Sequence, residues 1–343
     1  MNFIQPRIYK LFYVVLLITG ILSCTKGGDP DQPGDNIPMA FTTSVDWGVK
    51  SNSLIDTAEE LRSYPISILA NAEVGENTYF TFQNDKLYYE NGDWTYGDAK
   101  YWIPGAKYSF AAFAPFASTD VSSNSLSNGI VSYSSEGLKI TGYNTVNTAV
   151  DARTEDLLVA HYVRDNTSSK DYSVVPLNFE HLLSCITFSI RNTTNVDITK
   201  VSDIKLNGLE CKCDITLTTS SVDVDIYSDT GVITSADRNP EADKTPFLPK
   251  GMSEADYKPL FDCEKLTLLP QSLYGKDVIK LTFKVHKGTS DVNGTSYSVS
   301  LGNVDTIREW KAGKKYEYTM SITSTDILFQ VVEVPWIEHD IEL

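Results

Sequence analysis

The chain has few of the side chains that usually perform chemistry. Its 343 residues include four histidines and five cysteines, and no histidine lies with a serine, cysteine or carboxylate in a nucleophile motif. His181 alternates with Leu177 and Phe179 on the apolar side of an expected strand, where a hydrogen-bonded core histidine is the simpler interpretation. We therefore expect no catalytic residues, no enzyme activity and no cofactor.

Metal-binding patterns are also missing. The chain has no Cys-x-x-Cys pair, so zinc is not expected at the four cysteines of its main part. We interpret these four as buried thiols or as thiols that include one disulfide; they are Cys185, Cys211, Cys213 and Cys263. Residues 223–229 are rich in aspartate but lack the glycine and the final glutamate of a calcium loop. No metal site is expected.

Positive charge is scarce. Lysine and arginine number 29 against 45 aspartates and glutamates, which gives a net charge of −16. A chain with this balance is repelled by phosphate backbones and by anionic lipid surfaces. Nucleic acid is therefore excluded as an expected partner.

Long apolar runs are lacking too. The longest, at residues 11–21, follows Arg7 and Lys10. It is shorter than the ~20 residues that cross a bilayer, and its basic flank is typical of a secretory signal. The signal ends in Leu22-Ser23-Cys24, which resembles the lipobox of bacterial lipoproteins.

The lipobox resemblance implies that residues 1–23 are removed and that Cys24 receives lipid (palmitate among its acyl chains). It also implies a lipid-anchored protein of the outer membrane. Residues 24–38 are rich in glycine, proline and aspartate and have almost nothing to bury. Such a segment does not offset its own ordering entropy, so we expect a flexible tether.

Helical patterns are rare, and strand patterns fill the rest of the chain. Apolar and polar residues alternate along many short segments, which Gly, Asn, Asp and Ser punctuate as turns. Because no alternation of strands and helices is present, the pattern favours antiparallel β-sandwiches. The expected exceptions are a short helix at residues 57–62 and long loops at residues 118–148 and 235–256.

One nine-residue pattern occurs twice. Residues 102–110 and 310–318 both read Trp-x-x-Gly-x-x-Tyr-x-aromatic. The glycine permits a tight turn, and the two aromatic positions share one face of the strand that follows. Because a mature chain of about 320 residues is long for one core, we expect two domains, an N-terminal β-sandwich at residues 39–170 and a C-terminal one at residues 171–343.

Five blocks of sequence, in order, resemble the fimbrillin (Mfa-like) family. They run from about residue 41 to residue 336 and include both copies of the repeated pattern. The blocks are WIPGAKYSFAAFAP (102–115), DLLVA with VPLNFEHLLS (156–160 and 175–184), LLPQ (268–271), WKAGKKYEY (310–318) and VPW (334–336). Each block alone is a loose pattern, and the signal comes from their order behind a lipobox.

The family resemblance implies an all-β fold with two tandem transthyretin-like domains. It also implies a structural subunit (stem, anchor or tip) of a cell-surface fimbrium, or pilus, that supports adhesion. Such subunits are exported as lipoproteins and trimmed by a protease, after which a C-terminal strand of one subunit fills the groove left by the first strand of another. The expected partners are other pilus subunits, the outer membrane, and a host or bacterial surface ligand.

Two ends of the chain carry this scheme. The removable strand is expected to contain Phe41, Thr43 and Val45, with a protease cut after Arg62 or, second, after Lys50. Arg62 is alternatively an ordinary exposed arginine, and the donor segment is alternatively an ordinary last strand. The residues expected to fill the groove are Ile327, Phe329, Val331, Val334 and Trp336.

A different class of function remains open at this point. A tethered chain of β-sandwiches also suits a surface-exposed glycan-binding lipoprotein. Such a protein presents flat aromatic side chains on which sugars stack. The candidates in this sequence are Trp47, Trp94 and Tyr96.

Overall fold

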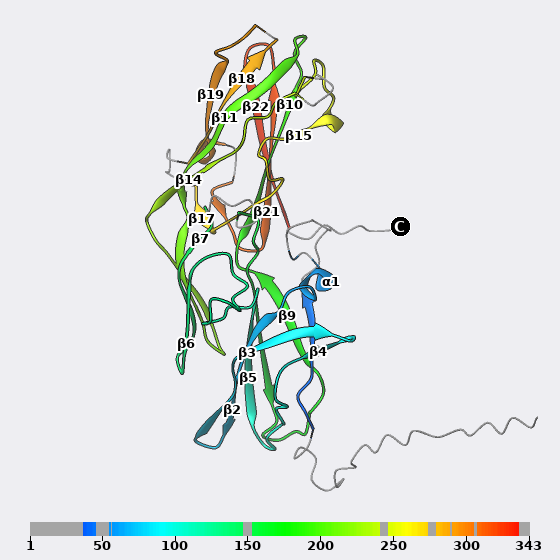
Figure 1. Cartoon of the computed structure of the whole chain (residues 1–343), viewed down its shortest axis with the longest axis vertical. Helices are drawn as coiled ribbons and strands as arrows, with labels where there is room; N and C mark the ends of the chain where they lie inside the picture. Colours follow the sequence, from blue (N-terminus) through cyan, green and yellow to red (C-terminus); the bar gives the residue numbers. More distant parts are fainter. Residues whose placement is uncertain are drawn as a thin grey trace, which may run out of the picture.

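Strands are the predominant regular structure of the computed structural model, which describes residues 37–45, 55, 57–146, 153–240, 246–273, 279–288, 290–304 and 307–335. They form an elongated molecule (Figure 1). The all-β sandwich fold expected from the alternating pattern is confirmed. In these ranges, no helix is long and apolar enough to cross a membrane.

A seven-stranded sheet forms one end of the molecule. Its strand pairs are antiparallel except for one: β1 lies parallel to β9. In spatial order its strands are β1 (Phe41–Val45), β9 (Val175–His181), β8 (Leu158–Asp165), β5 (Lys107–Ala114), β2 (Ile66–Val74), β3 (Asn77–Glu90) and β4 (Asp93–Thr95).

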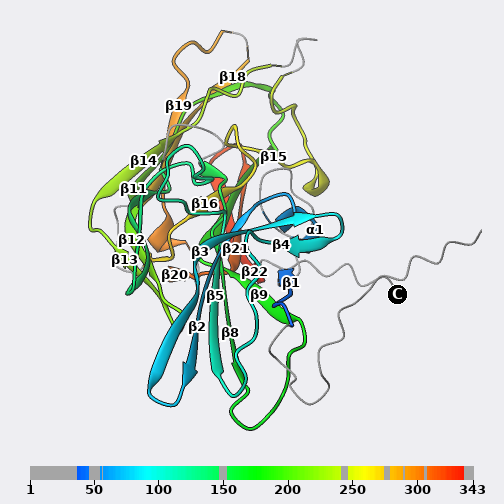
Figure 2. The same ribbon diagram turned by 60° about the horizontal axis from the view of Figure 1, so that its bottom comes forward.

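This sheet curls around its own core. The two edge strands, β1 and β4, lie in contact with each other, and Figure 2 shows them on the same side of the molecule as β9. The enclosed core is apolar and rich in aromatic rings, among them Phe82, Trp102 and Phe110. β1 therefore closes the gap between β9 and β4.

The other end of the molecule is a sandwich of two sheets around a second core. One sheet has the order β15 (Lys258–Pro259), β10 (Ser184–Asn192), β21 (Lys314–Ile322) and β22 (Ile327–Pro335), with β16 (Leu266–Leu268) also paired to β10. The second sheet has the order β14 (Thr230–Thr234), β11 (Ile198–Glu210), β18 (Lys280–Lys287) and β19 (Thr295–Ser300). A two-stranded piece joins β17 (Gln271–Ser272) to β20 (Glu309–Trp310).

A third core joins the two ends. It lies between the outer face of the seven-stranded sheet and a four-stranded sheet, and it contains Phe113, Tyr143 and Ile215. That sheet has the order β13 (Val222–Ile226), β12 (Lys212–Leu217), β7 (Gly137–Asn144) and β6 (Ile130–Ser134). Strands from both sides of residue 170 thus share sheets, at β7–β12 and at β1–β9. The division of the chain at residue 170 stays a prediction.

Helices are short, as expected. The helix predicted at residues 57–62 is α1 (Ala58–Leu61), and the side chain of Thr57 caps its N-terminus. Two turns of 3-10 helix are η1 (Glu254–Asp256) and η2 (Leu301–Asn303). The long loop predicted at residues 118–148 is wrong in its second half, because β6 and β7 lie there; the alternation of Leu138 and Ile140 with polar neighbours marks this hairpin.

The repeated nine-residue pattern builds the same corner twice. Gly105 and Gly313 both have positive φ, at 72° and 65°, a conformation that favours glycine. In the second copy, the Lys311 amide donates to the hydroxyl of Tyr316 at 2.9 Å. In the first copy, the amide one residue after the tryptophan donates in the same way to Tyr108. The two corners are structurally equivalent.

One difference between the corners follows from a single atom. The indole nitrogen of Trp310 donates to the Tyr318 hydroxyl at 2.9 Å. The residue equivalent to Tyr318 is Phe110, which has no hydroxyl. The indole nitrogen of Trp102 accordingly has no hydrogen-bond partner.

We predict that Tyr316→Phe lowers the free energy of unfolding by about 1 kcal/mol, because it leaves a corner amide without its acceptor. Tyr108→Phe should have a similar effect in the first corner. The control is Tyr79→Phe on an exposed part of β3, which should be neutral. Denaturant unfolding of the purified chain measures all three, and equal stability of all three variants would contradict the shared corner.

Candidate functional site

The inner face of β1 is buried in the core of the seven-stranded sheet. Phe41 and Val45 are 6% and 3% exposed, and Met39, just before the strand, is 2% exposed. On the outer face, the Ser44 hydroxyl donates to Asn178 of β9 at 2.7 Å. Three of the inward positions are therefore apolar and closed, as predicted for a strand that fills a groove.

Aromatic rings form the pocket that receives Phe41. Its ring centroid lies 5.5 Å from that of Phe82, 5.8 Å from that of Tyr96 and 6.1 Å from that of Phe110, all in edge-to-face geometry. Such pairs add about 0.5–1.5 kcal/mol each beyond their burial. The Tyr96 hydroxyl also donates to the Met39 carbonyl at 2.6 Å.

Thr43 occupies the one polar position on the inner face of β1. Its hydroxyl accepts a hydrogen bond from the indole nitrogen of Trp94 at 3.0 Å. Trp94 belongs to β4, and its side chain is buried against Tyr89. This bond joins the two edges of the curled sheet, and the sequence reasoning missed it. Trp94 and Tyr96 are therefore packing partners of β1 rather than exposed sugar platforms; Trp47 lies outside the described residues.

We predict that Thr43→Val lowers the free energy of unfolding by about 1–3 kcal/mol, because the indole N–H of Trp94 loses its acceptor while it stays buried. In a Trp94→Phe background the same substitution should cost much less. A double-mutant cycle measured by denaturant unfolding tests the coupling. Strictly additive effects would contradict a direct bond.

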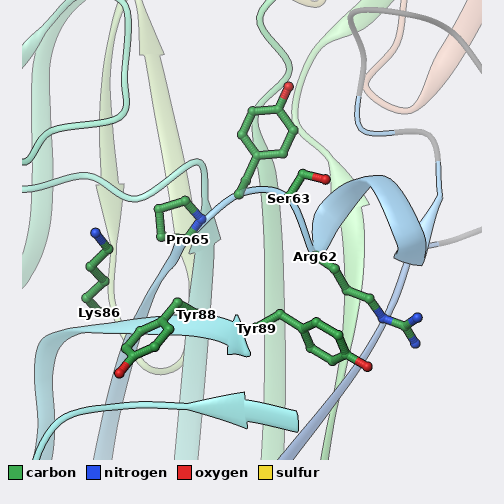
Figure 3. Close-up of a pocket in the computed structure, with 7 residues that line it drawn as sticks. Arg62, Ser63, Pro65, Lys86, Tyr88 and Tyr89 are labelled. Carbon is green, nitrogen blue, oxygen red and sulfur yellow. The ribbon is translucent and has the colours of Figure 1, made fainter. Parts of the chain in front are cut away.

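Arg62 lies immediately after α1 and is exposed. Its guanidinium carbon is 4.7 Å from the ring centroid of Tyr89. It borders a shallow hollow of about 350 Å³ together with Lys86 and Tyr88. In Figure 3 the Arg62 side chain extends from the end of the helix toward Tyr89 and away from the interior.

The bond after Arg62 is held in a weak local structure. The backbone amides of Ser63 and Tyr64 donate hydrogen bonds to the carbonyl oxygens of Glu60 and Leu61 at 2.9 and 3.0 Å. The peptide bond after Arg62 therefore lies in the closing turn of a four-residue helix. A helix of this length has little stability of its own. Unwinding this turn therefore breaks few helical hydrogen bonds, although the neighbouring Leu61 is buried in the core. Lys50, the second predicted site, lies outside the described residues.

β22 is an edge strand, paired along its length with β21. Val331 is buried and Ile327 and Phe329 are half-buried, and all three pack against the core of the second sandwich. Val334 lies on the opposite face of the strand, because side chains alternate between the two faces and Val334 is even-numbered whereas the three core-facing residues are odd-numbered. Trp336 lies outside the described residues.

The outer face of β22 was missed by the sequence reasoning. Leu328 and Val332 are 61% and 55% exposed, and Gln330 between them is also exposed. Apolar residues occupy both odd and even positions of this segment, and that pattern could have revealed the exposed apolar face.

The histidine and the four cysteines considered in the sequence analysis lie in the interior. His181 is buried, and its Nδ1 lies 2.7 Å from a carboxylate oxygen of Asp156, as expected for a core histidine. Within the same ranges, no three His, Cys, Asp or Glu side chains are grouped as a metal site requires.

All four described cysteines are free and buried. Burial raises the pKa of Cys213 to about 12 and that of Cys263 to about 11. Desolvation also raises the pKa of Cys211. These thiols are therefore poor nucleophiles near neutral pH, since the thiolate is the reactive form.

A family model described as fimbrillin-like matches residues 61–336, most of the chain. The chain belongs to the fimbrillin-like family. This membership supports a fimbrial subunit role at the cell surface, and it agrees with the resemblance of the five sequence blocks. No curated protein sequence matches the chain.

Solved structures share the fold of this fimbrillin-like chain. A fimbrial protein from Bacteroides vulgatus has a TM-score of 0.57 at 18% identity, over 87% of this chain and 99% of its own. Candidate cell adhesion proteins from Bacteroides uniformis and Bacteroides ovatus have TM-scores of 0.54 and 0.55 at 16% and 13% identity. Their matches cover 87% and 88% of this chain, and 99% of each relative. At these identities the likeness establishes the fold alone.

Proposed function

We propose that this protein is a structural subunit of a cell-surface fimbrium and that it polymerises by strand exchange after proteolytic trimming. The proposal is supported chiefly by β1, an edge strand whose inner face completes an aromatic core. The exposed Arg62 follows β1 in the sequence. A cut after Arg62 separates β1 and α1 from the rest of the molecule.

The energetic consequence of that cut is large. The segment that leaves carries five buried apolar side chains of the core, namely Met39, Phe41, Val45, Ile55 and Leu61. At about 1.5–3 kcal/mol for each, their loss exposes an apolar groove with a free energy on the order of 10 kcal/mol. This is comparable with the whole stability of an ordinary domain. A strand from another subunit that fills the groove restores this burial.

β22 is the strand we propose as the donor. It is an edge strand of nine residues near the end of the described chain, with apolar side chains on both faces. Strand addition supplies backbone hydrogen bonds to the free edge of β9 and side chains to the groove. The expected partner is thus another pilus subunit, of this or a related sequence.

Export as a lipoprotein precedes assembly in this proposal. Cys24 carries the lipid, residues 24–38 act as the tether, and the subunit reaches the outer face of the outer membrane before the cut. The signal, Cys24 and residues 24–36 lie outside the described residues. Two transthyretin-like domains and adhesion to a host or bacterial surface ligand complete the proposed role, which is structural rather than enzymatic.

We predict that limited trypsin treatment of the purified chain gives a species that begins at Ser63 and forms ladders in denaturing gels. Arg62→Gln should abolish the cut at this site, and combined with Lys50→Gln it should also abolish the ladders, since the donor strand then meets a filled groove. Arg308→Gln, at another exposed arginine, is the matched control and should assemble normally. N-terminal sequencing identifies the cut.

The contrary result separates the two classes of function. If the Arg62→Gln chain and the native chain both stay monomeric, while a polysaccharide retards the native chain in affinity gels, the protein is a glycan-binding lipoprotein. Ladders that form in Arg62→Gln as readily as in the native chain would refute trimming at this site.

A further inference from the structure

The outer face of β22 carries apolar side chains that its own subunit does not use. Leu328 and Val332 are more than half exposed, and the exposed Gln330 lies between them. Val334 follows on the same face and is half-buried. The outer face thus reads apolar, polar, apolar, apolar from Leu328 to Val334.

The inner face of β1 has a matching order in the opposite direction. Its inward positions are Met39, Phe41, Thr43 and Val45, which read apolar, apolar, polar, apolar. The polar member accepts the hydrogen bond from Trp94 at 3.0 Å. Any strand that replaces β1 must supply an acceptor at this position, because a buried donor without a partner costs about 1–3 kcal/mol.

We propose that β22 of a second copy enters the groove antiparallel to β9, with its outer face toward the core. Leu328 then takes the place of Val45, Gln330 that of Thr43, Val332 that of Phe41 and Val334 that of Met39. The carbonyl oxygen of the Gln330 side chain accepts the hydrogen bond of Trp94. This assignment rests on the proposed function and names the face, direction and register of its donor strand.

The alternatives each bury a polar group or leave one unpaired. In the antiparallel direction, the inner face of β22 places Phe329 opposite Trp94 and Glu333 in the position of Met39. In the parallel direction, the same face places Val331 opposite Trp94 when Phe329 takes the pocket of Phe41. The outer face inserted in the parallel direction places Asp326 in the position of Met39. A buried, unpaired carboxylate is costly.

The direction of insertion also has an energetic basis. β1 pairs with β9 in parallel, and parallel pairing is slightly less stable per residue than antiparallel pairing. Exchange of β1 for an antiparallel donor therefore strengthens the ladder at the edge of the sheet. Because the released strand pairs in parallel and its replacement pairs antiparallel, assembly is favoured over rebinding of the released segment.

We expect Gln330→Leu to speed the dissociation of subunits from assembled ladders by roughly tenfold, because Trp94 loses its acceptor. In a Trp94→Phe background, Gln330→Leu should have little effect. Dissociation is measured by exchange of fluorescently labelled full-length subunits after trypsin treatment. Gln330 is exposed in the monomer, so unchanged thermal stability of the untrimmed variant confirms that only assembly is affected.

Val332→Phe gives the opposite result in the same assay. Valine underfills the pocket that holds Phe41 between Phe82 and Tyr96, so a phenylalanine there should slow dissociation several-fold. The matched control is Val292→Phe, at a residue that is 87% exposed elsewhere, and it should change nothing.

Cross-linking reports the direction of the strand. A copy with Asn178→Cys and a copy with Phe329→Cys should be joined by a short bis-thiol reagent, since residue 329 takes the place of Ser44 beside Asn178. The four native thiols that the structure describes are buried and do not compete, and Cys24 leaves with the trimmed segment. Preferential joining of Val331→Cys instead would mean parallel insertion of the outer face, and preferential joining of Leu328→Cys or Val332→Cys would mean that the inner face enters; each of these results overturns the assignment.

The two levels of the proposal fail in different ways. If native subunits form no ladders, strand exchange itself is wrong. If they form ladders whose dissociation is unchanged by Gln330→Leu and by Val332→Phe, assembly stands but the face and register proposed here are wrong.

Discussion

The seven-stranded sheet depends on a single edge contact, the pairing of β1 with β9. β1 is five residues long, yet it is the strand that closes the curled sheet, since its other side meets β4. Phe41 lies among three aromatic rings, and Thr43 receives the indole N–H of Trp94. Burial, aromatic geometry and a polar bond therefore meet on one short strand that has no covalent connection to β9 nearby.

The rest of the molecule is also held by contacts that do not involve that strand. Tryptophan–tyrosine corners hold the start of β5 in the first unit and of β21 in the second, and both use the same amide-to-hydroxyl bond. The third core fastens β7 to β12 and so ties the two ends together. The two strands that we propose to move, β1 and β22, both lie at sheet edges. Both strands are thus peripheral in their sheets, while their inner faces pack in the cores.

Local pattern predicted much of the fold. Alternation along many short segments identified the all-β class, and the repeated pattern located both corners because glycine and aromatic spacing determine a turn and one strand face. Phe41 and Val45 of β1 are buried, and the removal of this strand stays a prediction. The segment at residues 118–148 was misread because its Ser, Asn and Gly content hid the alternation of β6 and β7.

Pairing between distant segments was not readable in the same way. That β1 lies parallel to β9, or that β7 pairs with β12, depends on how sheets meet, and a single sequence carries no direct sign of it. Trp94 illustrates the consequence. The sequence shows a tryptophan at this position but not whether its ring is exposed for sugars or buried as a hydrogen-bond donor. Only the position of β4 against β1 distinguishes the two cases. The two faces of β22 differ for the same reason.

Hydrogen exchange along β9 reports whether β1 is a removable strand that a neighbouring subunit replaces. In the intact chain β1 covers the outer edge of β9. One of the hydrogen bonds across this edge runs from the Val175 amide to the Ala40 carbonyl at 2.8 Å. The account predicts protected β9 amides in the intact chain, fast exchange when the segment before Ser63 is removed, and renewed protection in assembled ladders. Protection of β9 that is the same in the intact, trimmed and assembled states would contradict a removable strand that a neighbour replaces.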